Sequence, residues 1–322
     1  MKRMINLIAA AVISLSLLPG RAFAAELLIP VGEVIGLELS DGSVTVAAFD
    51  DASGSAAKDA GLQIGDEILT IDGLTIDSAE DVRSALDRCD GDIDLCVARG
   101  GKKHRFTLTP RSTGDGPRLG IYLRQGIAGI GTVTYYDPDT GRFGSLGHGV
   151  SCPRGRLLEM TQGRACKGRI LSVKKGTCGH PGQLKGSADP SSPIGTLKKN
   201  TPQGVFGIAS SGWTGQPLPV AAFDEVTTGA AMILSTVSDD GPREYSVEIL
   251  KIYPKDRPDC RNFLLKVTDP DLLETTGGIV QGMSGSPIIQ DGKLVGAVTH
   301  VLVNDPTTGY GIFIENMLDA AG

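Results

Sequence analysis

A serine flanked by glycines is the clearest chemical feature of the sequence. Residues 282–287 read Gly-Met-Ser-Gly-Ser-Pro, with Ser284 at the centre. A serine hydroxyl is a weak nucleophile that needs a base, a group that orients this base, and donors for the developing oxyanion. The glycines allow a tight turn that can direct the N–H groups of Gly282 and Ser284 to one point. The segment therefore predicts the nucleophile and oxyanion hole of a serine protease, although an ordinary glycine-rich turn has the same composition.

The base and its orienting carboxylate must come from elsewhere in the chain. His148 lies between two glycines at a predicted strand end, which is an accessible position for a general base. Asp269 ends a strand-like segment before a proline and is predicted to orient the histidine. The resulting order of His148, Asp269 and Ser284 is that of chymotrypsin-like enzymes. Three aspartates remain as alternatives for the carboxylate: Asp239, Asp240 and Asp271.

The segment after the nucleophile supports this interpretation. Residues 291–300 (Asp-Gly-Lys-Leu-Val-Gly-Ala-Val-Thr-His) closely resemble the strand that follows the nucleophile in chymotrypsin-like proteases. By that resemblance, Thr299 and His300 line the substrate groove. His300 is also an alternative base, but that choice would leave His148 without an acid–base role.

The composition indicates the elements that position these residues. The 322 residues include 44 glycines and 18 prolines with few aromatics, which is typical of short strands joined by tight turns. From residue 119 onward almost every segment alternates like a strand, and only residues 314–321 have a helical pattern. We therefore expect a mainly β protein, with an α+β domain first and a chymotrypsin-like double β-barrel over residues 119–322.

The first domain resembles a PDZ domain over residues 31–111, with a linker at 112–118. The resemblance rests on residues 35–38, on 60–68 (Ala-Gly-Leu-Gln-Ile-Gly-Asp-Glu-Ile) and on the Ile-Asp-Gly at 71–73. PDZ domains bind an extended peptide as an added strand at a sheet edge. The resemblance implies a carboxylate loop and receiving strand made by Ile35, Gly36, Leu37, Glu38 and Leu39. A domain of this shape that only packs on its neighbour is the alternative.

The N-terminus and the cysteines indicate where the protein works. Lys2 and Arg3 precede an apolar run at 5–18 and an Ala-Phe-Ala at 22–24, so residues 1–24 are predicted to be a signal peptide, with a retained anchor as the alternative. Export permits disulfides among the six cysteines. A zinc site with Cys152, Cys166 and Cys178 near His180 is conceivable, but the spacing does not favour it and we predict no metal or cofactor. The net charge of −6 gives no reason to expect nucleic-acid binding.

Four longer motifs resemble the stage IV sporulation protein B peptidases: residues 129–138, 146–148, 277–287 and 296–311. The resemblance implies that His148, Asp269 and Ser284 are the catalytic residues. It further implies secretion into the space between forespore and mother-cell membranes, and self-cleavage near the N-terminus under control of the PDZ domain. The expected partners are that N-terminal segment and a membrane-bound inhibitor of an intramembrane metalloprotease, whose cleavage activates a late sigma factor.

Two other classes remain open. A PDZ adaptor on a protease-shaped body without turnover would share these motifs. A quality-control protease of the high-temperature-requirement type has the same two modules, but there the PDZ domains follow the protease. Met283 stands where digestive enzymes have the aspartate that pairs with a freed N-terminus, so activation by that salt bridge is excluded.

Overall fold

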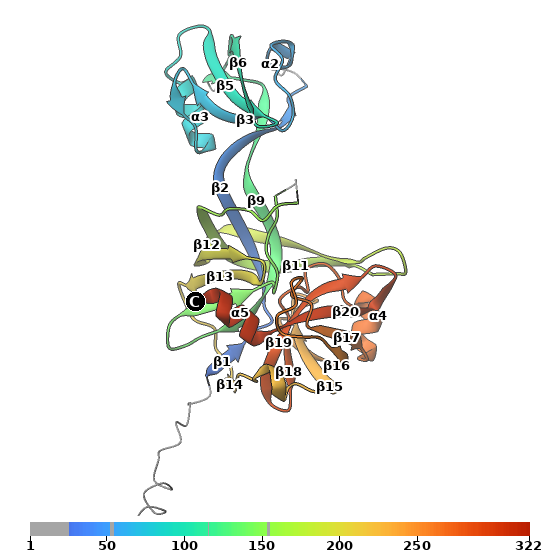
Figure 1. Ribbon diagram of the computed structural model, residues 1–322. Coiled ribbons are helices and arrows are strands. Elements are labelled where there is room, and N and C mark those ends of the chain that lie inside the picture. Colours follow the sequence, from blue (N-terminus) through green and yellow to red (C-terminus); the bar gives the residue numbers. More distant parts are fainter. Residues whose placement is uncertain (1–25, 52–54, 115, 153–154) are drawn as a thin grey trace, which may run out of the picture.

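The computed structural model describes residues 26–51, 55–114, 116–152 and 155–322. Two β-barrels pack side by side, and a smaller α+β domain stands above one of them (Figure 1). The predicted mainly β fold, with a PDZ-like domain and a double barrel, is confirmed. The predicted signal peptide at residues 1–24 lies outside the described residues.

The first barrel is a ring of six strands. A single path of pairings leads from β9 to β2, and a further β2–β9 pairing closes the ring. Buried aliphatic side chains such as Ile35, Leu37 and Val133 fill it. A short ladder of β1 (Leu27–Pro30) with β14 (Leu218–Pro219) extends the sheet. The six strands in ring order are β9 (Ile121–Tyr136), β10 (Arg142–Ser145), β13 (Gly204–Ala209), β12 (Gln183–Thr201), β11 (Gln162–Lys174) and β2 (Val34–Phe49).

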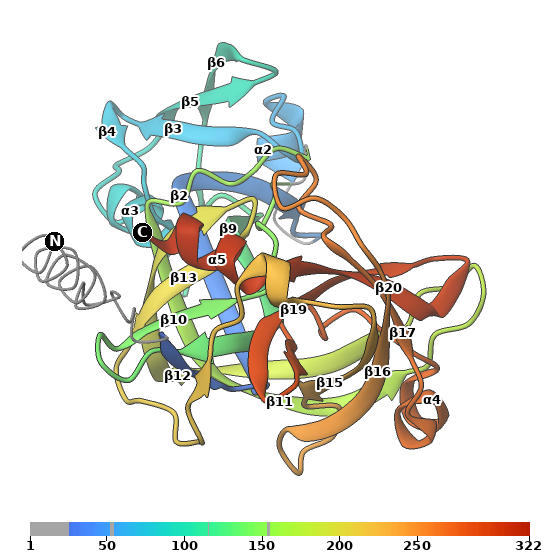
Figure 2. The same ribbon diagram turned by 60° about the horizontal axis from the view of Figure 1, so that its bottom comes forward.

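The second barrel is also a closed ring of six antiparallel strands, around Phe263, Leu265 and Ile288. A short 3₁₀ helix, η1 (Phe223–Glu225), precedes it, and α4 (Pro270–Thr276) follows one of its strands. The C-terminal helix α5 (Ile314–Ala321) lies over the junction of the barrels (Figure 2), where Met317 packs with Tyr135 and Phe206 of the first barrel. The strands in ring order are β15 (Gly229–Ser235), β16 (Arg243–Ile252), β17 (Phe263–Val267), β20 (Asp305–Phe313), β19 (Lys293–Leu302) and β18 (Pro287–Gln290).

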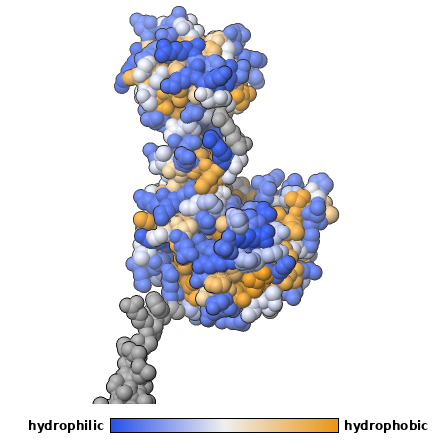
Figure 3. All heavy atoms as spheres, viewed as in Figure 1, coloured by the Kyte–Doolittle hydropathy of each residue, from blue (hydrophilic) through white to orange (hydrophobic). Residues whose placement is uncertain are grey.

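The PDZ-like domain shares two strands with the first barrel. The long strands β2 and β9 leave the barrel side by side and continue into this domain. The domain is a separate globular unit that projects from the barrels (Figure 3). Its core contains Val44, Ile68 and Leu95. Its other elements are α2 (Ser55–Asp59), β3 (Glu67–Ile71), β4 (Leu74–Thr75), α3 (Ala79–Leu86), β5 (Ile93–Arg99), β6 (Lys102–Leu108), β7 (Arg111–Thr113) and β8 (Gly116–Arg118).

Local signals explain several of these elements. Ser78 caps α3 by accepting a hydrogen bond from the Asp81 N–H, as its position before an acidic first turn predicts. Asp72 and Gly73 both have positive φ and form the predicted two-residue hairpin between β3 and β4.

The domain boundaries differ from the predicted ones. Residues 34–39 belong to the first barrel, so the PDZ-like domain is inserted into that barrel and does not precede it. Residues 112–118 are no linker between domains, because the hairpin β7–β8 occupies most of them. A strand pattern looks the same in both halves of β2, which is why the sequence could not show that its halves serve different domains. Within the described residues, no helix has the length and apolar character needed to span a membrane.

Candidate active site

Five of the residues predicted for catalysis, the oxyanion hole and the substrate groove line one pocket between the two barrels, with a volume of about 530 Å³. They are Ser284 and Gly282 from the loop before β18, Thr299 and His300 from β19, and His148 from the loop after β10. The first barrel contributes the histidine and the second contributes the serine. The pocket therefore lies where a nucleophile and a base from separate barrels meet.

The loop that carries Ser284 is fixed by close backbone contacts. Gly285 has a φ of 98°, and a Cβ atom there would lie 2.1 Å from the carbonyl oxygen of Thr132. Gly282 also has positive φ, at 103°. The side chain of Met283 is fully buried in the core of the second barrel and anchors the loop from inside. Only glycine fits the two flanking positions, as the sequence predicts.

Two N–H groups beside the serine are left without partners. Among the described residues, neither the Gly282 nor the Ser284 N–H donates a hydrogen bond, although their neighbours Met283 and Gly285 both do. The Ser284 hydroxyl donates to the carbonyl oxygen of Thr299 at 2.7 Å. Two free donors next to a nucleophile are what an oxyanion requires.

Thr132 is a residue of the site that sequence reasoning did not single out. It lies on β9, is fully buried, and its hydroxyl donates to the carbonyl oxygen of Gly282 at 2.9 Å. Its N–H donates to the carbonyl oxygen of Ser284 at 3.1 Å. These bonds hold the serine loop of one barrel against a strand of the other. A polar residue within an apolar strand is the signal that could have identified it.

His148 sits on a tight turn. Leu146 and Gly147 both have positive φ, and a Cβ atom on Gly147 would lie 2.9 Å from Cγ2 of Thr299. The Nδ1 atom of His148 is 3.0 Å from the carbonyl oxygen of Gly149. Since a carbonyl oxygen only accepts, Nδ1 carries the proton and Nε2 is the basic nitrogen. Burial lowers the pKa of His148, and this hydrogen bond opposes the shift only in part.

His300 lies beside His148, with 5.2 Å between the ring centroids. Burial first, and then the neighbouring His148, lower the pKa of His300 to about 4. Its Nδ1 atom is buried and has no hydrogen-bond partner among the described residues. His300 therefore stays neutral near pH 7 and brings no charge to the pocket.

The predicted contact between Asp269 and His148 is not formed in this structure. The Asp269 carboxylate caps α4 by accepting from the N–H groups of Asp271 and Leu272, and it also accepts from Ser246. Asp269 does not line the pocket, and among the described residues no carboxylate pairs with the His148 ring. An aspartate before a proline is also a helix N-cap signature, and here the cap is what forms.

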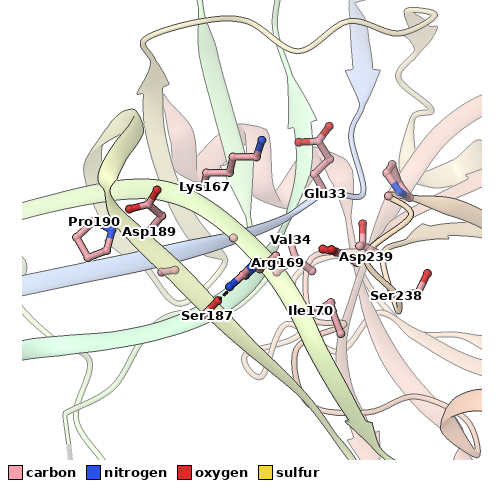
Figure 4. Close-up of a pocket in the computed structure, with 15 residues that line it drawn as sticks. Glu33, Val34, Lys167, Arg169, Ile170, Ser187, Asp189, Pro190, Ser238 and Asp239 are labelled. Atoms are coloured by element: carbon pink, nitrogen blue, oxygen red, sulfur yellow. Dashed lines mark hydrogen bonds between the residues drawn. The ribbon is translucent and has the colours of Figure 1, made fainter.

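The alternative aspartates also lie away from His148. Asp271 is in the first turn of α4, and Asp240 accepts hydrogen bonds from Ser238 and Arg243. Asp239 lines a different pocket of about 960 Å³, where it faces charged residues of the first barrel such as Glu33 and Lys167 (Figure 4). The base of this site therefore has a backbone carbonyl where a triad has a carboxylate.

The predicted PDZ peptide site is also wrong. Residues 35–39 pair with β11 on one side and with β9 on the other. A strand that is paired on both sides has no free edge to receive a peptide. Ile35, Gly36, Leu37, Glu38 and Leu39 are instead part of the wall of the first barrel.

A groove in the PDZ-like domain lies elsewhere, between α3 and the first residues of β9. Its volume is about 510 Å³, and Val82 and Leu86 of α3 face residues 119–123 across it. Residues 121–123 pair with β2 on one side, and no other described strand pairs with them on the other. This groove thus offers an open strand edge next to an apolar helix face.

The cysteines form no metal centre in the part of the chain that the structure describes, where no group of three or more metal-ligating side chains occurs. Cys166 is buried and Cys178 is exposed, and both carry free thiols. Burial raises the pKa of the Cys166 thiol.

Comparisons with known proteins identify the family of the chain. The family model described as SpoIVB peptidase S55 matches residues 116–318, and a PDZ domain model matches residues 52–93. A Bartonella henselae protein named as a zinc metalloprotease, BH06270, is 32% identical over 98 residues. That match spans 29% of this chain and 27% of the relative, so the chain spans about a quarter of that relative's length.

Solved structures show only a distant likeness. The active form of the Rv3671c protease of M. tuberculosis has a TM-score of 0.38 and 16% identity, covering 62% of this chain and 75% of that chain. Its inactive form has a TM-score of 0.35 and 15% identity, covering 60% and 82%.

Proposed function

Because the chain belongs to the SpoIVB peptidase S55 family, we propose that it is a regulatory serine endopeptidase in which Ser284 is the nucleophile and His148 the base. The observation that carries this proposal is the pair of unpartnered N–H groups on Gly282 and Ser284, in the pocket that also holds His148. Two free N–H donors beside a serine and a histidine are the arrangement that an oxyanion hole requires.

The chemistry follows from the tautomer of His148. The Nδ1 atom of His148 carries a proton and donates it in a hydrogen bond to the Gly149 carbonyl oxygen. The Nε2 atom is therefore free to take the hydroxyl proton of Ser284 while the Oγ atom of Ser284 attacks the peptide carbonyl carbon. The N–H groups of Gly282 and Ser284 bind the oxygen that becomes negative. The imidazolium then returns its proton to the leaving amine, and water hydrolyses the acyl-enzyme by the same steps.

The hydroxyl of Ser284 must first turn away from Thr299. In this structure it donates to the Thr299 carbonyl oxygen, which cannot accept a proton. Rotation about one side-chain bond releases it towards the pocket, so a bound substrate can complete the arrangement.

The PDZ-like domain extends the proposal to a protein partner. The open edge at residues 121–123 and the apolar face of α3 fit an extended peptide added as a strand. We place the peptide there, in the groove of the PDZ-like domain, because residues 35–39 have no free edge.

The biological setting rests on family membership and on the predicted signal peptide. The protein is exported to the space between forespore and mother-cell membranes, where it cuts its own N-terminal segment. It then cleaves the extracytoplasmic part of a membrane-bound regulator in sporulation signalling, which leads to activation of a late sigma factor.

Substitution of the nucleophile tests the chemical part of the proposal. Purified Ser284→Ala protein is expected to lose roughly a millionfold in kcat towards itself and towards peptides. It should also not react with a fluorophosphonate probe that labels the wild type. The exposed serine at 112 provides the control, since Ser112→Ala should cleave and label normally. Self-cleavage by Ser284→Ala protein, in the absence of other proteases, would contradict the assignment.

A PDZ adaptor without turnover is the second candidate. It is favoured by the absence of a carboxylate partner for His148 among the described residues and by the Ser284–Thr299 hydrogen bond. It predicts that the wild type does not label and that Ser284→Ala protein functions normally in sporulating cells.

A further inference from the structure

The pocket that holds Ser284 has no charged side chain near pH 7, because burial lowers the pKa of both of its histidines, His148 and His300. None of its lining residues is Asp, Glu, Lys or Arg, and half are Leu, Ile or Val. The second barrel supplies Ile279, Val280 and Val301, and the first barrel supplies Leu37, Leu39 and Ile127. The contrast with the charged pocket of Figure 4 is plain, since that pocket is lined by Glu33, Lys167, Arg169, Asp189 and Asp239.

Strand pairing makes the apolar wall of the first barrel continuous. Leu37 pairs with Gly129, and Leu39 pairs with Ile127, so these four residues share one face of the β2–β9 ladder. All four line the pocket. On the opposite wall, a Cβ atom on Gly309 would lie only 2.5 Å from the Cδ1 atom of Ile279. The absence of a side chain at Gly309 therefore leaves room for Ile279.

The position of this wall determines which part of a substrate it meets. The attacked carbonyl carbon is bonded directly to the Cα of its own residue, so that side chain must start beside Ser284 and the Gly282 N–H. The segments bounding this space are residues 279–282 and 299–301. Residues 300–302 pair with β20 on one side, and no described strand pairs with them on the other, so an extended substrate can lie along their free edge.

We propose that this is a specificity pocket for uncharged aliphatic side chains, and that the enzyme cleaves extended peptides after Leu, Ile, Val or Met. This inference rests on the proposed peptidase function and names its substrate class. A charged side chain would lose its hydration in this pocket and find no counter-ion, whereas an aliphatic one would be removed from water against Ile279 and Val301.

Two positions allow a charge to be introduced from opposite walls. Val301 is partly exposed at the pocket and packs with its other side against the core of the second barrel, so Val301→Asp adds a carboxylate at some cost in stability. Gly129 has no positive φ, and a Cβ atom there would meet nothing within 4 Å, so Gly129→Asp is sterically free. Val301→Asn and Gly129→Asn are matched controls that keep shape and polarity but remove the charge.

The test is cleavage of a mixed peptide library by the purified protein, with the cut bonds identified by mass spectrometry. We expect kcat/KM at least about tenfold higher after Leu, Ile, Val or Met than after Lys, Arg, Asp or Glu. Each Asp variant should raise cleavage at bonds flanked by Lys or Arg relative to its Asn control. If one variant fails to fold, the other provides the same comparison.

The outcomes separate this inference from the proposed function. A wild type that prefers charged residues, or Asp variants indistinguishable from both Asn controls, overturns the specificity pocket while leaving the peptidase in place. A wild type that cuts no peptide and does not react with a fluorophosphonate contradicts the peptidase itself.

Discussion

The two sides of the active site are held in different ways. The loop with Ser284 is fixed by glycines without room for a Cβ, by the buried side chain of Met283, and by two hydrogen bonds from Thr132. The loop with His148 has a single hydrogen bond to orient the ring, from Nδ1 to the Gly149 carbonyl oxygen. The nucleophile and the oxyanion donors are therefore preorganised, whereas the orientation of the base can still change.

This difference indicates where control can act. A backbone carbonyl fixes the tautomer of His148 but stabilises the imidazolium less than a carboxylate would. Substrate or a partner that closes the pocket can improve the position of the base without disturbing the oxyanion donors. The long strands β2 and β9 reach from the PDZ-like domain to the pocket wall at Leu37 and Gly129, so they connect that domain directly to the first-barrel side of the site.

The largest expected effect comes from disturbing the loop that carries Ser284, which is the more tightly fixed of the two. Gly285→Ala should lower the free energy of unfolding by about 3 kcal/mol or more and abolish cleavage, because the new Cβ meets the Thr132 carbonyl oxygen at a left-handed φ. Gly292→Ala is the matched control: its φ is 73°, but nothing lies within 4 Å of a Cβ there. It should cost only about 1 kcal/mol and keep activity. Chemical denaturation and a peptide assay measure both effects, and equal losses in the two variants would show that the Thr132 contact is unimportant.

The pH dependence of activity tests the role of His148, whose loop is less tightly fixed. Because burial lowers the pKa of His148, its neutral, basic form persists below pH 6.5, and kcat/KM should fall only as the pH drops through that lowered pKa. His148→Gln should remove this activity.

His300→Gln is the control for that experiment. The pKa of His300 is about 4, so it is already neutral near pH 7, and an acid limb set by His148 should remain when His300 is replaced. If His300→Gln removes activity and His148→Gln does not, His300 on β19 is the base and the assignment of His148 is wrong.

Sequence reasoning succeeded where structure depends on neighbouring residues. The glycine-flanked turn of Ser284 and the cap of α3 by Ser78 need only a few adjacent positions. It failed where one pattern serves two purposes. An alternating strand does not show which domain each half of β2 joins, and an aspartate before a proline reads equally as a catalytic carboxylate or a helix cap. Those choices depend on tertiary packing, which local periodicity does not encode.

The smallest expected effect concerns Asp269. Asparagine caps helices about as well as aspartate, so Asp269→Asn should keep both the stability of α4 and cleavage within about tenfold of the wild type. Asp269→Ala should lower stability by about 1 kcal/mol, because the N–H groups of Asp271 and Leu272 lose their acceptor. Some activity should be lost with it, since α4 leads through Gly277 and Gly278 into the segment before Ser284.

A catalytic carboxylate predicts the opposite pattern. Replacing the aspartate of a Ser-His-Asp triad by asparagine costs roughly ten-thousandfold in kcat, because the histidine takes the wrong tautomer. A large loss in Asp269→Asn with unchanged stability would therefore show that Asp269 reaches His148 in the working enzyme. The loop with His148 would then adopt a second conformation in which Asp269 orients the ring. The arrangement described above would be that of an inactive form of the enzyme.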